Sequence, residues 1–145
     1  MSPDSFNPVL STQECWSRLA QEEFGRLGYH LADEVHIAPV NYAVDGQRLV
    51  FRTAEGSKLL GVVMNDDVAF EVDRVLEEEE RAWSVLVRGR ASLLEGDAAL
   101  DVDNLRLRPW VSTNKFNVVS IAVDEISGRD YPLSRPWQQL IPEDE

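Results

Sequence analysis

The chain has 145 residues, of which 43% are hydrophobic and 28% charged, a balance typical of a soluble domain whose core needs no metal or disulfide. Its 26 acidic residues outnumber 14 basic ones, and the net charge of −12 disfavours nucleic acid and anionic membranes as partners. Cys15 is the single cysteine, which excludes an internal disulfide and, with two histidines, disfavours a metal site. Without a membrane-spanning apolar run or a signal pattern, the sequence predicts a cytoplasmic protein.

The first predicted element is an amphipathic helix over residues 11–24. Ser11 and Glu14 fit a capping box, in which the serine hydroxyl accepts from the Glu14 N–H and the Glu14 carboxylate accepts from the Ser11 N–H. Gly25 and Gly28 are predicted to mark the end of the helix and the turn into the next element. Apolar residues at helical spacing are Cys15, Trp16, Leu19 and Ala20.

Beyond the helix the apolar pattern shifts towards a period of two, which predicts strands. The predicted strands are residues 26–31, 35–44, 47–53, 68–72, 83–94 and 116–123. Asp45-Gly46 is a hairpin signal because both residues tolerate positive φ, and the acidic run Glu77–Glu80 predicts a solvated loop.

The predicted elements have many hairpin-like connections and no regular alternation of strand and helix, which favours a small antiparallel barrel. Short helices are expected at 59–64 and, as a helical turn, within 97–107. We therefore predict a mainly β fold and a single domain over residues 1–145, with flexible tails at 1–10 and 134–145.

A candidate anion site follows the third predicted strand. Arg52 and Thr53 end the strand, Gly56 permits a tight turn, and Ser57 and Lys58 open a helix. The N–H groups at a helix start suit an anion, an arginine adds a bidentate fork and a lysine adds a point charge. An ordinary capped surface loop explains the same residues about equally well.

A set of motifs in order resembles the FMN-binding split-barrel proteins of the pyridoxamine 5′-phosphate oxidase-like family. The motifs are Glu14-Cys15-Trp16, Gly25-Arg26-Leu27, Pro39-Val40-Asn41-Tyr42, Phe51-Arg52-Thr53, Gly56-Ser57-Lys58, Phe70-Glu71-Val72-Asp73 and Trp83-Ser84-Val85 running to Arg88-Gly89-Arg90-Ala91. A looser echo, Pro109-Trp110 and Ile126-Ser127-Gly128-Arg129, extends the resemblance almost to the end of the chain.

This resemblance implies a six-stranded antiparallel split barrel that forms a homodimer with FMN in clefts between the subunits. By the same likeness, the strand His36–Asn41, which includes Pro39 and Val40, would run alongside the isoalloxazine ring. Arg52, Thr53, Ser57 and Lys58 would hold the phosphate and the ribityl chain. Trp83 and Ser84 would approach the flavin from a neighbouring strand or across the dimer, although packing in the barrel accounts for Trp83 equally well.

The resemblance implies flavin redox chemistry on an unidentified small-molecule substrate or electron acceptor. His36 and Asn41 stand where the oxidase itself has basic side chains, so oxidation of vitamin B6 is not expected. His36 has no identifiable partner and is interpreted as structural rather than as an acid or base. A flavin carrier or sensor, a haem-binding or deazaflavin-binding barrel, and a purely structural protein are the alternatives.

Overall fold

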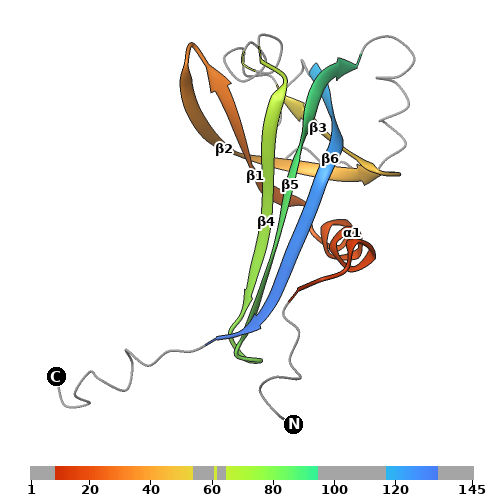
Figure 1. Cartoon of the computed structure of the whole chain (residues 1–145), viewed down its shortest axis with the longest axis vertical. Coiled ribbons are helices and arrows are strands. Elements are labelled where there is room, and N and C mark those ends of the chain that lie inside the picture. The colour runs from red at the N-terminus through yellow and green to blue at the C-terminus, as the bar shows by residue number, and fades with distance from the viewer. Residues whose placement is uncertain (1–8, 54–60, 62–64, 95–116, 134–145) are drawn as a thin grey trace, which may run out of the picture.

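The computed structural model describes residues 9–53, 61, 65–94 and 117–133. It contains one helix and six strands, arranged as a closed antiparallel barrel in the order β1-β2-β3-β6-β5-β4 (Figure 1). The elements are α1 (Thr12–Gln21), β1 (Phe24–Leu31), β2 (Glu34–Asp45), β3 (Arg48–Thr53), β4 (Asp67–Leu76), β5 (Arg81–Leu94) and β6 (Asn117–Pro132). The predicted mainly β split-barrel fold is confirmed.

The core follows from the alternation of side chains along each strand, because successive residues point to opposite faces. The inward side chains exclude solvent completely or nearly so: Leu27, Tyr42, Leu49, Phe51, Phe70, Val72, Val85, Val87 and Ile121. Helix α1 packs against the barrel through Cys15 and Leu19, both fully buried. Burial raises the pKa of the Cys15 thiol, in keeping with its expected role as a small buried apolar group.

Three long strands extend beyond the rest of the barrel. Residues 72–76 of β4, 81–85 of β5 and 128–132 of β6 are register partners of one another. They lie beyond Glu71, the last residue of β4 that pairs with β1, and beyond Ala122, the last residue of β6 that pairs with β3. We call these three segments the distal ribbon. Figure 1 shows it projecting below the barrel, and a register shift between Arg88 and Gly89 marks where the three-stranded run bends into the barrel.

Most local predictions are confirmed. The capping box is present, the Glu14 N–H donating to Ser11 Oγ at 3.1 Å and the Ser11 N–H donating to Glu14 Oε1 at 3.0 Å. The hairpin between β2 and β3 turns through Gly46, whose φ is 62°, and Glu77–Glu80 forms the turn between β4 and β5. The side chain of Trp16 is partly buried against the core.

Several boundaries were predicted wrongly. The helix ends at Gln21 rather than at residue 24, and both Gly25 and Gly28 lie inside β1. Gly25 is required by packing, since an added Cβ would lie 2.7 Å from the Phe70 ring on β4. The last strand continues to Pro132 because β5 pairs with it along its whole length, in spite of its polar residues. The predicted flexible arm at 1–10 is wrong for its last residue, because Leu10 is 8% exposed and its N–H donates to the Gly128 carbonyl. The predicted turn within 97–107, the short helix at 59–64 apart from Gly61, Ser57, Lys58, Trp110 and the tail from 134 lie outside the described residues.

Candidate functional site

Strand β2 changes neighbours in the middle of its length. Its residues up to Asn41 pair with β1, and those from Tyr42 onward pair with β3. Tyr42 anchors this point, because its buried hydroxyl donates to the Leu19 carbonyl at 2.6 Å and its backbone N–H donates to the Glu23 carbonyl. Burial raises the pKa of Tyr42 well above its ordinary value, so the hydroxyl stays protonated as a donor. We call this place, together with the end of β3, the strand split.

Arg52 and Thr53 end β3 at the strand split. Arg52 pairs in register with Val118 of β6 and is half-buried, while Thr53 is 4% exposed and its carbonyl accepts from Asn117 Nδ2 at 3.5 Å. Tyr42–Phe51 is the last register pair between β2 and β3, so Arg52 follows directly after the point where β2 leaves β3. The predicted cation therefore lies where the strand that was predicted to follow the flavin ring separates from β3.

The predicted residues at the strand split divide between the two faces of the sheet. Pro39, Asn41 and Arg52 alternate with buried neighbours and lie on the outer face. Val40 and Thr53 are 6% and 4% exposed, so their side chains fill the barrel and only their backbone groups are available on the outer face. This outer face also carries a small apolar cluster of Ala43, Val50, Leu94 and Val118. An arginine beside apolar side chains suits a ligand that joins an anionic group to an apolar ring.

Trp83 and Ser84 lie far from the strand split, on the distal ribbon. Trp83 is 3% exposed and belongs to the core, and the Arg18 guanidinium lies 5.5 Å from the centre of its ring. Ser84 lies on the outer face, opposite Arg129 of β6. From Val118, beside Arg52, to Arg129 the chain runs roughly 35 Å along the strand. Arg52 and Ser84 of one chain are therefore too far apart to hold the same flavin, and only a second chain would bring them together.

Sequence reasoning missed two clusters of charged side chains, one where β4 leaves β1 and one on the distal ribbon. Arg26 Nη1 of β1 lies 2.6 Å from Glu71 Oε1 and 3.1 Å from Asp73 Oδ2, both on β4. Burial, together with the hydrogen bond and repulsion from Asp73, raises the pKa of Glu71 to about 7. Asp130 binds two further arginines, Arg18 and Arg81, at 3.0 and 2.9 Å.

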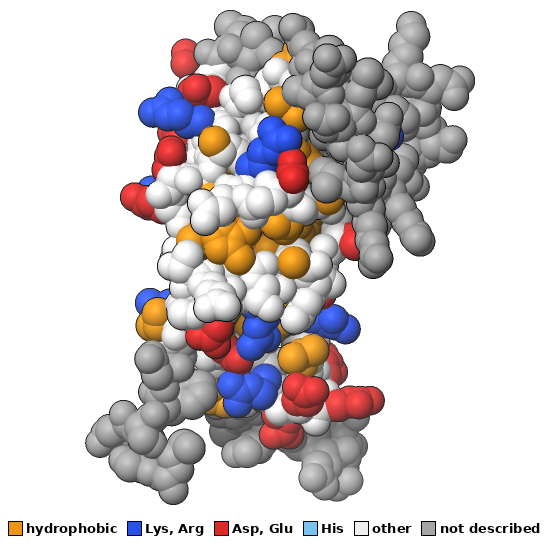
Figure 2. All heavy atoms as spheres, turned by 90° about the vertical axis from the view of Figure 1, so that its right-hand side faces the viewer, with side chains coloured by type: hydrophobic (Ala, Val, Ile, Leu, Met, Phe, Trp, Pro, Cys, Tyr) orange, Lys and Arg blue, Asp and Glu red, His pale blue; other side chains and the backbone are white. Residues whose placement is uncertain are grey.

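These charged clusters were missed because their members are distant in sequence, although the motifs Gly25-Arg26-Leu27 and Phe70-Glu71-Val72-Asp73 contain the residues of one of them. On the side of the molecule shown in Figure 2, basic and acidic side chains interleave below an apolar band.

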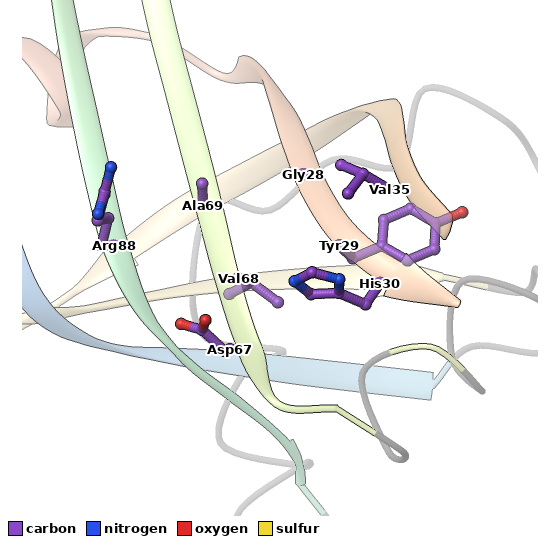
Figure 3. Close-up of a pocket in the computed structure, with 8 residues that line it drawn as sticks. All are labelled: Gly28, Tyr29, His30, Val35, Asp67, Val68, Ala69 and Arg88. Atoms are coloured by element: carbon purple, nitrogen blue, oxygen red, sulfur yellow. The ribbon is translucent and has the colours of Figure 1, made fainter. Parts of the chain in front are cut away.

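A shallow pocket of about 220 Å³ lies on β1, β2, β4 and β5, again outside the sequence-predicted set. His30 of β1 and Asp67 of β4 line it together with Arg88 of β5 (Figure 3). Nearby, His36 stacks on Tyr29 with ring centres 5.5 Å apart and lies 3.4 Å from a Glu34 oxygen. These contacts fit the structural interpretation of His36. Within the residues that the structure describes, no group of three or more metal-ligating side chains occurs.

Among the same residues, no helix is both long enough and apolar enough to cross a membrane.

The barrel and the strand split are those of a split-barrel protein, and comparison with known proteins gives the family. The model of the family described as pyridoxamine 5′-phosphate oxidase matches residues 11–130. The chain therefore belongs to this family.

Two solved structures resemble the chain over nearly its whole length. One is a Corynebacterium glutamicum protein whose name makes it a candidate pyridoxamine 5′-phosphate oxidase; it is 41% identical, with a TM-score of 0.79 over 90% of this chain and 98% of that one. The other is an FAD-binding protein of Mycobacterium smegmatis, 34% identical, with a TM-score of 0.73 over 88% of this chain and 100% of that one. An uncharacterized protein of Mycobacterium tuberculosis is 39% identical over 61% of this chain and 79% of its own length.

Proposed function

We propose that this protein binds FMN at the strand split, as a homodimer, and carries out oxidoreductase chemistry on the flavin. The position of Arg52 carries the proposal: it is a cation on the outer face at the end of β3, one residue past the last register pair with β2, Tyr42–Phe51. Family membership and the FAD-binding relative support a flavin as the ligand.

The residues at the strand split fit the parts of FMN. Arg52 would bind the phosphate, aided by Ser57 and Lys58, since a guanidinium pairs with phosphate through two parallel hydrogen bonds. The backbone of Pro39, Val40 and Asn41 would lie along the ring. When bound, the flavin supplies the hydride and electron chemistry, so the protein needs no nucleophile of its own. Its residues orient the ring and set the charge around it.

The homodimer follows from the separation between the strand split and the distal ribbon. If Ser84 and Arg52 serve one flavin, Ser84 must come from the second subunit, because in one chain they lie roughly 35 Å apart along β6. A two-fold symmetric pair would complete two identical sites at once. The side chain of Trp83 is 3% exposed, so it would pack in the core beneath Ser84 and would not contact the flavin ring.

The test is a titration of FMN and riboflavin against the wild type, Arg52→Ala and Arg48→Ala. Arg48 is the matched control, because it lies on the same face of β3 and its Nη2 is engaged with Asp45 at 2.6 Å. Losing one charge-assisted hydrogen bond should weaken FMN binding about 10- to 150-fold in Arg52→Ala. Riboflavin affinity should stay unchanged in every variant, since riboflavin has no phosphate. Equal affinity of the wild type for FMN and riboflavin would refute the phosphate site.

FAD is the second candidate, favoured by the relative at 34% identity. FAD contains the FMN moiety, so Arg52 would serve both cofactors, and the same titration with FAD ranks them. Turnover of a reduced nicotinamide or a quinone by the flavin-loaded protein separates an enzyme from a flavin carrier or sensor. Turnover of pyridoxamine 5′-phosphate should be absent, since His36 and Asn41 stand where the oxidase itself has basic side chains. His36 is instead engaged by Tyr29 and Glu34.

A further inference from the structure

A second hollow, of about 270 Å³, lies on the outer face at the distal ribbon. It is lined by Val9, Ser84, Leu86, Ser127, Gly128 and Arg129. The two serines and the arginine offer hydrogen-bond donors, while Leu86, 40% exposed, offers an apolar wall. Ser127 and Arg129 belong to the motif Ile126-Ser127-Gly128-Arg129, which the proposed flavin site does not use.

The backbone around this hollow is held from both sides. Arg129 pairs with Ser84 of β5 on one side and forms an isolated bridge with Val9 on the other. The Leu10 N–H donates to the Gly128 carbonyl at 3.0 Å. Gly128 itself faces the core, where an added Cβ would lie 2.8 Å from Cys15 Sγ. Arg129 therefore projects outward from a fixed strand, on the same face as Ser84.

The charge of Arg129 is available to a ligand. Among the described residues it has no carboxylate within ion-pair distance, whereas Asp130 next to it already binds Arg18 and Arg81. Glu71 and Asp73 of β4, on the far side of β5 from Arg129, are engaged by Arg26. In a protein with a net charge of −12, an arginine that the carboxylates of the described segments leave unengaged is unusual and marks a place for an anion.

We propose that this hollow is an oxyanion subsite, in which Arg129 binds the phosphate or carboxylate group of a small ligand and Ser84 and Ser127 donate to the same group. The inference deepens the proposed function, since Ser84 would face the flavin of the second subunit. The anionic group has two sources in that setting. It is either the second phosphate of a bound FAD or the anionic group of a separate substrate.

The experiment compares the wild type with Arg129→Gln and Arg88→Gln. Arg88 is the matched control, because it is also exposed on the outer face, has no carboxylate within ion-pair distance among the described residues, and lies outside this hollow. Both variants remove one positive charge, so the general effect of net charge cancels between them. Inorganic phosphate is titrated into the flavin-free and the FMN-loaded protein, and FAD and FMN are titrated into the flavin-free protein.

If a separate substrate supplies the anion, Arg129→Gln should weaken phosphate binding to the FMN-loaded protein about 10- to 100-fold, and Arg88→Gln should leave it nearly unchanged. If FAD supplies it, Arg129→Gln should weaken FAD binding by the same factor and leave FMN binding unchanged. Equal effects of the two substitutions, or no effect of either on phosphate and FAD, would overturn the subsite.

A wild type that binds no flavin refutes the proposed function alone. In that case the phosphate titration of the flavin-free protein still decides for or against Arg129.

Discussion

The strand split and the distal ribbon use the same antiparallel pairing but are stabilised differently. At the strand split, one buried hydrogen bond from Tyr42 to Leu19 and an apolar cluster around Val50 organise the backbone, and Arg52 lies on the outer face one residue past the last register pair between β2 and β3. At the distal ribbon, three strands have one another as register partners, Asp130 of β6 binds Arg81 of β5, and the same carboxylate binds Arg18 of α1. The strand split therefore has a buried side-chain hydrogen bond, whereas the ribbon combines buried residues such as Trp83 and Val85 with partly exposed ion pairs.

The largest expected effect is at Gly89, next to the register shift that joins the distal ribbon to the barrel. In Gly89→Ala the new Cβ would collide with the Ala122 carbonyl, and backbone atoms have little room to move. We expect unfolding in urea to show a loss of about 2–3 kcal/mol. Gly28→Ala is the control, because its Cβ would meet nothing closer than 3.8 Å. Equal stability of the two variants would contradict the close contact between Gly89 and the Ala122 carbonyl.

The next effect tests the anchor of the strand split. Tyr42→Phe keeps the ring but leaves the Leu19 carbonyl without its donor in a buried place, which should cost about 1–2 kcal/mol. Urea denaturation measures the loss. Tyr131→Phe, on the distal ribbon and 39% exposed, should change stability by less than about 0.5 kcal/mol. A Tyr42→Phe variant as stable as the wild type would show that packing alone holds helix α1 in place.

A smaller effect depends on pH and tests the charge cluster of Arg26, Glu71 and Asp73 where β4 leaves β1. Because the pKa of Glu71 is raised from 4.5 to about 7 in the folded protein, the folded state binds a proton more tightly than the unfolded state. Stability from this group is therefore present below about pH 4.5 and is lost as pH rises through about 7. With screening at a partly exposed site, the loss should be about 1 kcal/mol.

The measurement is unfolding in urea at several pH values between 5 and 8. Glu71→Gln should flatten the fall in stability over this range, because glutamine does not titrate. Glu125→Gln, an exposed carboxylate on β6, is the control and should keep the slope of the wild type. Identical slopes for all three proteins would show that Arg26 fully offsets the repulsion between Glu71 and Asp73.

The smallest effect concerns the ion pair between the helix end and β4. Arg74 Nη1 lies 3.3 Å from Glu22 Oε2, and the arginine side chain is 56% exposed. Arg74→Gln should cost less than about 0.5 kcal/mol, because water and salt screen the pair. Thermal unfolding at low and high salt should show the difference shrinking as salt rises. A loss above 1 kcal/mol would place this pair among the main supports of the ribbon.

Local features of this protein were determined by the sequence itself. The capping box of Ser11 and Glu14, the turn at Gly46 and the turn at Glu77–Glu80 depend on residues within a few positions of one another. These local structures can therefore be predicted without knowledge of the fold. The place of Arg52 near the end of a strand was also predicted, since the apolar pattern that ends there is a local signal, whereas its role in binding stays a prediction.

Only the tertiary structure decided what these pieces do together. The contact of Arg26 with Glu71 joins residues 45 positions apart, and strand register alone sets it. Register likewise places Ser84 beside Arg129 and far from Arg52, although Ser84 and Arg52 were predicted to serve one ligand. Gly25 was expected to end a helix because glycine's freedom of φ can be recognised from the sequence. Its actual role is to make room for Phe70, a contact between distant residues that the sequence did not reveal. Pairing between distant segments depends on the whole core, and no short stretch of sequence carries that information.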